Sequence, residues 1–83
     1  MLSAQKKSKL TWRCRRGMLE LDLLFNQFLP QVLDSMTDEE YTMVVAFLEH
    51  PDPDIYAWLM GYEVPLDEET LRCVHFIQSA IQS

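Results

Sequence analysis

The sequence predicts an all-α protein, a single small domain of about five helices, on three observations. Apolar residues recur at helical spacing in several segments, capping signals separate these segments, and no segment shows sustained strand alternation. The chain of 83 residues contains only 2 glycines and 4 prolines, too few for the tight turns of an all-β fold. With 48% hydrophobic residues it can build one core, so we expect one domain over residues 1–83, with a loose start over residues 1–5.

The first two helices are expected on either side of Gly17. The spacing predicts a short helix over about residues 5–15 and a second over about residues 18–34. Pro30 lies inside the second pattern and should kink or split that helix near Gln27 or Phe28, because it removes a backbone donor. The inward face of the second helix comprises Leu21, Leu24, Phe25, Phe28 and Val32.

A capping box predicts the start of the third helix. The Thr37 hydroxyl can cap the first turn, and the Glu40 carboxylate can reach back to the Thr37 amide. The helix should end at His50, because a residue before a proline avoids helical angles. Its expected inward residues are Tyr41, Val44, Val45 and Leu48.

The last two helices also carry signals at their ends. Asp52 is expected to be the N-cap of the fourth helix, with Pro53 at the first helical position and Gly61 ending the helix with positive φ. The acidic run over residues 67–69 suits the positive end of a fifth helix. The expected inward residues of that helix are Leu71, Val74, Ile77 and Ile81.

Charge is distributed unevenly along the chain. Residues 1–16 contain six basic residues and no acid, whereas the rest contains one arginine and all 13 acids, for a net charge of −6. An acidic body is repelled by phosphate backbones and anionic membranes, so we expect no nucleic-acid partner. Two alternatives remain open: the basic segment itself binds nucleic acid, or the two halves of the chain attract one another.

Targeting signals are not recognisable in the sequence. The basic start leads into Leu10-Thr11-Trp12-Arg13 and not into an apolar signal core, and the longest apolar run is far short of a membrane span. Two cysteines are too few for a disulfide framework. We therefore expect a cytoplasmic protein with reduced thiols and no direct membrane insertion.

Catalytic and metal-binding patterns are weak. The sequence has no glycine-rich phosphate loop and no serine or cysteine nucleophile at a recognisable spacing from a histidine, so we expect no enzyme. Four residues could form a metal site on paper: Cys14, His50, Cys73 and His75. Two of these, Cys73 and His75, are two residues apart on a predicted helix and point roughly 200° apart around its axis, so we expect no metal.

The segment Arg16-Gly17-Met18-Leu19-Glu20 indicates a binding surface. If its backbone is near helical, Arg16 and Glu20 form an exposed i,i+4 ion pair that leaves part of the guanidinium fork free. Gly17 then leaves room for close approach of another backbone or a flat ligand. Arg13 and Arg15 extend the positive cluster. The alternative is a surface salt bridge beside a turn glycine.

A second segment, Asp54 to Gly61, places Trp58 on a short helix. Tryptophan is enriched at interface hot spots, which favours a partner-binding role. A tryptophan that closes the edge of the core fits equally well, and both interpretations stay open.

The stretch from Leu10 to Asp22, LTWRCRRGMLELD, closely resembles the signature region of the SdhE family, the bacterial flavinators of succinate dehydrogenase. Arg16-Gly17-x-x-Glu20 matches the RGxxE motif of that family. The segments over residues 37–40 and 52–59 follow the family pattern in the same order. The resemblance covers the chain from about Lys9 to Gln78.

This resemblance implies a five-helix assembly factor that acts on other proteins. Such a factor assists covalent attachment of FAD to the flavoprotein subunit of succinate dehydrogenase, and of the related fumarate reductase, while the client performs the chemistry. We expect a monomer without a cofactor of its own. Alternatives are an antitoxin-like partner-binding protein, as some family members have been described, or a small nucleic-acid-binding protein using residues 6–16. The expected partner-binding residues are Arg13, Arg15, Arg16, Gly17, Glu20 and Trp58.

Overall fold

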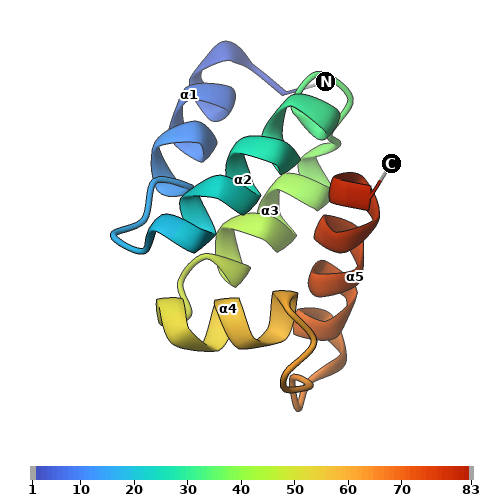
Figure 1. The fold of residues 1–83 in the computed structure, drawn as a ribbon. Helices are drawn as coiled ribbons and strands as arrows, with labels where there is room; N and C mark the ends of the chain where they lie inside the picture. The colour runs from blue at the N-terminus through green and yellow to red at the C-terminus, as the bar shows by residue number, and fades with distance from the viewer. Residues whose placement is uncertain (1, 83) are drawn as a thin grey trace.

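The computed structural model describes residues 2–82, and within them it contains five helices and no strand (Figure 1). The helices are α1 (Ala4–Arg13), α2 (Leu19–Val32), α3 (Asp38–Phe47), α4 (Asp52–Leu59) and α5 (Glu68–Gln82). The all-α prediction is confirmed. No helix in this part of the chain has the length and apolar character needed to cross a membrane.

The beginning of the chain packs against the rest of the molecule. The Ser3 hydroxyl accepts a hydrogen bond from the Lys6 amide at 3.2 Å and caps α1, while Leu2 is buried in the core. Residues 2–5 therefore do not match the expectation of a loose start, because an apolar side chain and a helix cap hold them. Met1 lies outside the described residues.

Helix α2 continues through Pro30, so the predicted split is wrong. Pro30 is exposed, and the neighbouring Phe28 and Leu29 are buried in the core. The Leu33 amide still bonds to the Leu29 carbonyl at 2.9 Å beyond the proline. Tertiary packing of the flanking residues thus offsets the one hydrogen bond that the ring removes.

A capping box sets the start of α3, whereas α4 begins after a proline without a side-chain cap. The predicted capping box is present: the Glu40 amide donates to the Thr37 hydroxyl at 3.1 Å, and the Thr37 amide donates to the Glu40 carboxylate at 2.9 Å. The prediction for α4 is wrong by one residue, because Pro51 is its N-cap and Asp52 is the first helical residue. The Asp52 carboxylate instead binds Arg16.

Gly61 ends α4 as predicted, with φ of 78°. The Tyr62 amide bonds to the Ala57 carbonyl at 2.9 Å, and the Gly61 amide bonds to the Trp58 carbonyl at 3.2 Å. This pair of bonds is the Schellman motif, in which a left-handed glycine satisfies the last carbonyls of a helix.

The core lies where α5 meets α2, α3 and α4, and α1 packs against α3 (Figure 1). The Phe28 ring is central. Its centroid lies 6.4 Å from that of the Phe25 ring and 5.8 Å from that of the Phe76 ring, and both contacts are edge-on. Expected inward residues that are buried include Leu21, Phe25, Phe28, Val44, Leu48, Val74 and Ile77. The remaining ones are half-buried, and all of them except Leu71 pack against the core: Leu24, Val32, Tyr41, Val45, Leu71 and Ile81.

Candidate functional site

Arg16 joins the α1–α2 loop to the α3–α4 loop. Its Nε and Nη2 atoms each lie 2.7 Å from Oδ1 of Asp52, the first residue of α4. Nη1 donates to the carbonyls of Leu48 and Arg13 at 3.0 and 3.2 Å, and Nη2 to that of His50 at 3.3 Å. A guanidinium has five N–H donors, so these contacts engage the whole fork.

The expected Arg16–Glu20 ion pair is therefore wrong. Met18 has extended backbone angles (φ −100°, ψ 116°) and α2 begins at Leu19, so residues 16 and 20 do not share a helical turn. The Arg16 side chain is only 18% exposed, which also overturns the expectation that it is largely exposed with part of its fork free. The Arg16 amide adds a 2.7 Å bond to the Asp22 carboxylate, so this junction is held from both backbone and side chain.

Glu20 and Gly17 face outward beside this junction. Glu20 is exposed in the first turn of α2, and within residues 2–82 its carboxylate has no hydrogen bond or ion pair. Gly17 is exposed, does not have positive φ, and a Cβ added to it would meet no atom within 4 Å. The fold itself does not need a glycine at this position, so any need for one would arise from an approaching molecule.

Two tyrosines that the sequence patterns did not single out pack together near Glu20, and Tyr56 is the one that the Glu20 carboxylate affects. Tyr56 follows Asp52 by one turn of α4, and its ring packs edge-on against the Tyr62 ring at 6.1 Å. Desolvation raises the pKa of Tyr56 above its ordinary value, and the nearby Tyr62 phenol and Glu20 carboxylate raise it further. The i,i+4 spacing of Asp52 and Tyr56 places both residues on one face of α4, but no local signal indicates that this face lies beside Glu20. We call Gly17, Glu20, Tyr56 and Tyr62 the motif surface.

The remaining predicted arginines lie on the α1 side of the Arg16 junction. Arg13 is half-buried at the end of α1, and its carbonyl accepts from Arg16. Arg15 is exposed, with its guanidinium carbon 5.9 Å from the centre of the exposed Trp12 ring. Of these, Arg15 is the cation most accessible to a partner.

Much of the basic N-terminal segment is paired within the chain. Lys6 lies 3.1 Å from Asp38, and Lys7 lies 3.0 Å from Asp34. With the Arg16–Asp52 pair, three of the six basic residues contact carboxylates of the acidic body. The alternative in which the two halves of the chain attract one another is confirmed by these ion pairs. The pairs leave less positive charge available to a phosphate backbone.

Trp58 lies at the edge of the core between α3 and α4. Its ring is half-buried. The ring centroid lies 5.0 Å from that of the His50 ring, in edge-on contact, and 6.1 Å from that of the Phe47 ring. These contacts favour the core-edge interpretation, and a partner contact at Trp58 stays a prediction.

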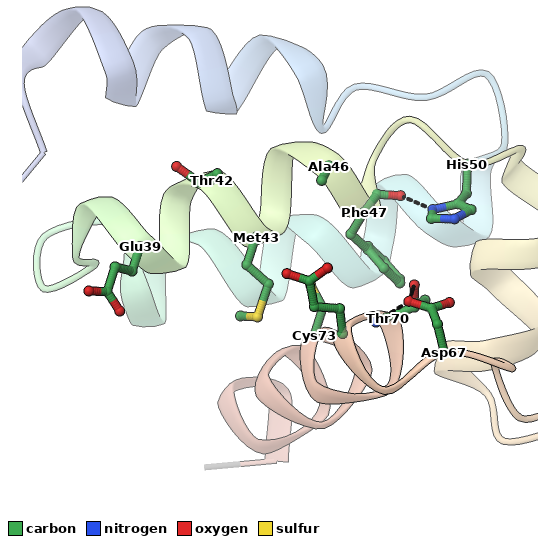
Figure 2. Close-up of a pocket in the computed structure, with 10 residues that line it drawn as sticks. Glu39, Thr42, Met43, Ala46, Phe47, His50, Asp67, Thr70 and Cys73 are labelled. Carbon is green, nitrogen blue, oxygen red and sulfur yellow. Dashed lines mark hydrogen bonds between the residues drawn. The ribbon is translucent and has the colours of Figure 1, made fainter.

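A cavity of about 320 Å³ lies between α3 and α5 (Figure 2). Nδ1 of His50 is bonded to the Phe47 carbonyl at 3.0 Å, so this nitrogen does not face a nucleophile. Burial raises the pKa of the Cys73 thiol to about 12, with the nearby Cys14 adding to the shift. A neutral buried thiol is a poor nucleophile, so the cavity does not combine the groups needed for covalent catalysis.

The cysteines and histidines do not assemble the metal site considered above. Cys14 and Cys73 are both buried and unbridged, whereas His75 is exposed on α5. Over residues 2–82, no group of three or more histidine, cysteine or acidic side chains is arranged to hold a metal ion.

Comparison with known proteins identifies relatives over nearly the whole chain. A family profile described as "Flavinator of succinate dehydrogenase" matches residues 8–81. The chain is 47% identical to the FAD assembly factor SdhE of Legionella pneumophila (strain Paris), covering 90% of this chain and 94% of that protein. It is 40% identical to the protein of the same name from Idiomarina loihiensis, covering 92% and 84%. The solution structure of a UPF0350 protein superposes with a TM-score of 0.73 at 39% identity, covering 95% of this chain and 84% of that one.

Proposed function

Because the chain belongs to the family of succinate dehydrogenase flavinators, we propose that it binds the flavoprotein subunit of succinate dehydrogenase and promotes covalent attachment of FAD to it. The flavoprotein subunit of fumarate reductase is a second proposed client. We further propose that the chain acts as a monomer in the cytoplasm. In this role it is no enzyme and holds no cofactor of its own, since the client supplies both flavin and reacting residue.

The observation that carries the proposal is the contrast between Arg16 and its neighbours. Arg16 is fully engaged inside the molecule, whereas Gly17 and Glu20 are exposed on the segment that Arg16 holds. We assign Arg16 as a positioning residue that fixes the α1–α2 loop against α4. Gly17 and Glu20 then form the contact with the client.

This arrangement suggests how a small protein can assist a covalent step without performing it. A rigid surface that binds one conformation of the client raises the population of that conformation. If flavin and acceptor side chain are aligned in it, the reaction gains from orientation alone. The open space over Gly17 permits backbone-to-backbone approach, and the Glu20 carboxylate can accept hydrogen bonds from the client.

Co-expression with the flavoprotein subunit tests the proposal. Covalent flavin per client, measured by in-gel fluorescence after denaturation, should rise with the wild-type chain. It should fall with Gly17→Leu, which adds bulk, and with Glu20→Gln, which removes charge. Each comparison is made at matched amounts of folded factor.

Matched controls exist elsewhere on the surface. Glu39 occupies the second position of α3 as Glu20 does of α2, so Glu39→Gln removes an equivalent charge. Ser79 is exposed near the C-terminal end of α5, so Ser79→Leu adds bulk there. Figure 1 shows α5 on the opposite side of the view from the α1–α2 loop. Both controls should retain wild-type flavin levels. Wild-type levels with Gly17→Leu and Glu20→Gln as well would remove Gly17 and Glu20 from the mechanism.

A further inference from the structure

The loop between α4 and α5 exposes a row of apolar side chains. Tyr62 and Val64 are 68% and 71% exposed, and Leu66 is fully exposed. They alternate along the loop, with buried Pro65 between the last two. Figure 1 shows the loop projecting from the end of the molecule beyond α4 and α5. We call Tyr62, Val64 and Leu66 the apolar ridge.

Contacts at both ends fix the loop that carries the ridge. The Schellman bonds at Gly61 hold its beginning. At its end the Asp67 carboxylate accepts from the Thr70 amide at 3.0 Å and from the Thr70 hydroxyl at 2.7 Å. The buried ring of Pro65 anchors the middle. A surface ordered in advance loses less conformational entropy on binding, so this ridge is suited to a partner.

The ridge continues the motif surface. Tyr62 belongs to both, because its ring packs on Tyr56, which lies beside Glu20. On α2, the exposed Leu19 and Leu23 lie on either side of Glu20 in the sequence. Within the ridge itself, Tyr62, Val64 and Leu66 expose large apolar side chains close together in the sequence, and exposed apolar patches mark interaction sites in soluble proteins.

Charge around the ridge argues against a second copy of this chain as the occupant. Glu63 lies within the ridge, and Asp67, Glu68 and Glu69 follow it directly. Two copies that docked through their ridges would bring these carboxylates together, which costs free energy at an interface. The complementary surface is an apolar patch bordered by lysine or arginine.

We infer that the apolar ridge is a second part of the client-docking surface and binds an apolar patch with a basic border on the flavoprotein subunit. This inference rests on the proposed function. The ridge supplies affinity through buried apolar area, whereas Gly17 and Glu20 align the client. Loss of the ridge should therefore weaken binding without impairing the complex once formed.

The test is a titration of the purified flavoprotein subunit, free of covalent flavin, with variants of this chain. Val64→Ser/Leu66→Ser should raise the Kd at least about tenfold. At saturating concentration it should restore wild-type covalent flavin per client, whereas Gly17→Leu should remain low at saturation. The apolar control Val64→Ile/Leu66→Met should keep the wild-type Kd. Because both side chains are exposed, the serine variant should melt with the wild type.

The outcomes separate this inference from the proposed function. An unchanged Kd for the serine variant, while wild type still binds and flavinylates the client, would overturn the role of the ridge alone. A wild-type chain that neither binds the client nor raises its covalent flavin would overturn the proposed function. Sedimentation could instead show a wild-type dimer that dissociates in the Val64→Ser/Leu66→Ser variant. The ridge would then be an interface between two copies of this chain, and the inference would be overturned.

Discussion

At the scale of single residues, the two charged members of the RGxxE motif do different work. Arg16 bonds to Asp52 and to the carbonyls around it, whereas Glu20 faces solvent. Substitution of Arg16 and substitution of Glu20 would therefore impair function for different reasons. With Arg16 the junction between two loops is disturbed, and with Glu20 only the surface changes.

This difference predicts that stability depends on Arg16 and hardly on Glu20. Arg16→Ala leaves the half-buried Asp52 carboxylate and the Leu48 and His50 carbonyls without their donor. It should lower the free energy of unfolding by about 1–3 kcal/mol. Glu20→Gln should change it by less than about 0.5 kcal/mol. Urea unfolding at neutral pH measures both.

The Asp52→Ala variant is the control for the Arg16 result. If the two residues act as a pair, the double variant with Arg16→Ala should be less destabilised than the sum of the single variants. Additive losses, or an Arg16→Ala protein as stable as wild type, would contradict the structural role of Arg16. Arg16→Lys should recover only part of the stability, because an ammonium cannot replace the planar fork.

At the scale of elements, the start of α5 depends on the charge of Asp67. Its hydrogen bonds from the Thr70 hydroxyl and then the Thr70 amide lower the pKa of this carboxyl below 3.8. A carboxyl with a lowered folded-state pKa stabilises the fold above its unfolded pKa, and this contribution is lost as the pH falls through the folded value.

The Asp67→Asn variant should therefore show a pH-dependent deficit. At neutral pH it should unfold at lower urea concentration than wild type, because the amide accepts hydrogen bonds more weakly than a carboxylate. The deficit should shrink as the pH falls from the ordinary pKa of 3.8 through the lower folded-state pKa, below which the wild-type carboxyl is also neutral. A deficit of constant size down to about pH 2 would show that charge at residue 67 does not stabilise α5.

The packing of α2 against α5 gives a second prediction at this scale. Phe28 is buried at the centre of the core, whereas Leu24 on the same helix is half-buried. Phe28→Ala should cost about 3–5 kcal/mol, and Leu24→Ala should cost less. Thermal or urea unfolding ranks the two variants, and a smaller loss for Phe28→Ala would contradict the observed orientation of α2.

At the scale of the whole molecule, the two thiols report on global unfolding. Burial raises the pKa of Cys14 and of Cys73 to about 12, so in the folded protein both are neutral and shielded. In the unfolded chain their pKa returns to about 8.5 and more thiolate forms. At mildly alkaline pH, alkylation should be slow in water and accelerate together with the urea transition. Rapid alkylation of either cysteine without denaturant would show that the core opens locally there.

Local signals in the sequence determined where most helices begin and end. The Thr37–Glu40 box and the Gly61 cap form bonds between residues at most five apart, so their partners are visible in the sequence. The apolar periodicity of α2 and α5 likewise identified most of the core. The resemblance at Arg16-Gly17-x-x-Glu20 identified the family, because a motif can be recognised from the order of its residues without knowledge of their contacts.

Tertiary structure alone decided what the motif residues touch. Arg16 binds Asp52, which lies 36 residues away, and no local rule selects that partner over Glu20. Two apparent conflicts have the same origin: Pro30 stays helical because its neighbours are buried, and Asp52 binds a guanidinium although it resembles a cap. Likewise, the sequence of the apolar ridge resembles an ordinary linker. Only the structure shows that Pro65 is buried while Val64 and Leu66 on either side of it are exposed. Hydrogen bonds within one turn follow from the order of residues, whereas exposure and long-range ion pairs follow from how the helices pack.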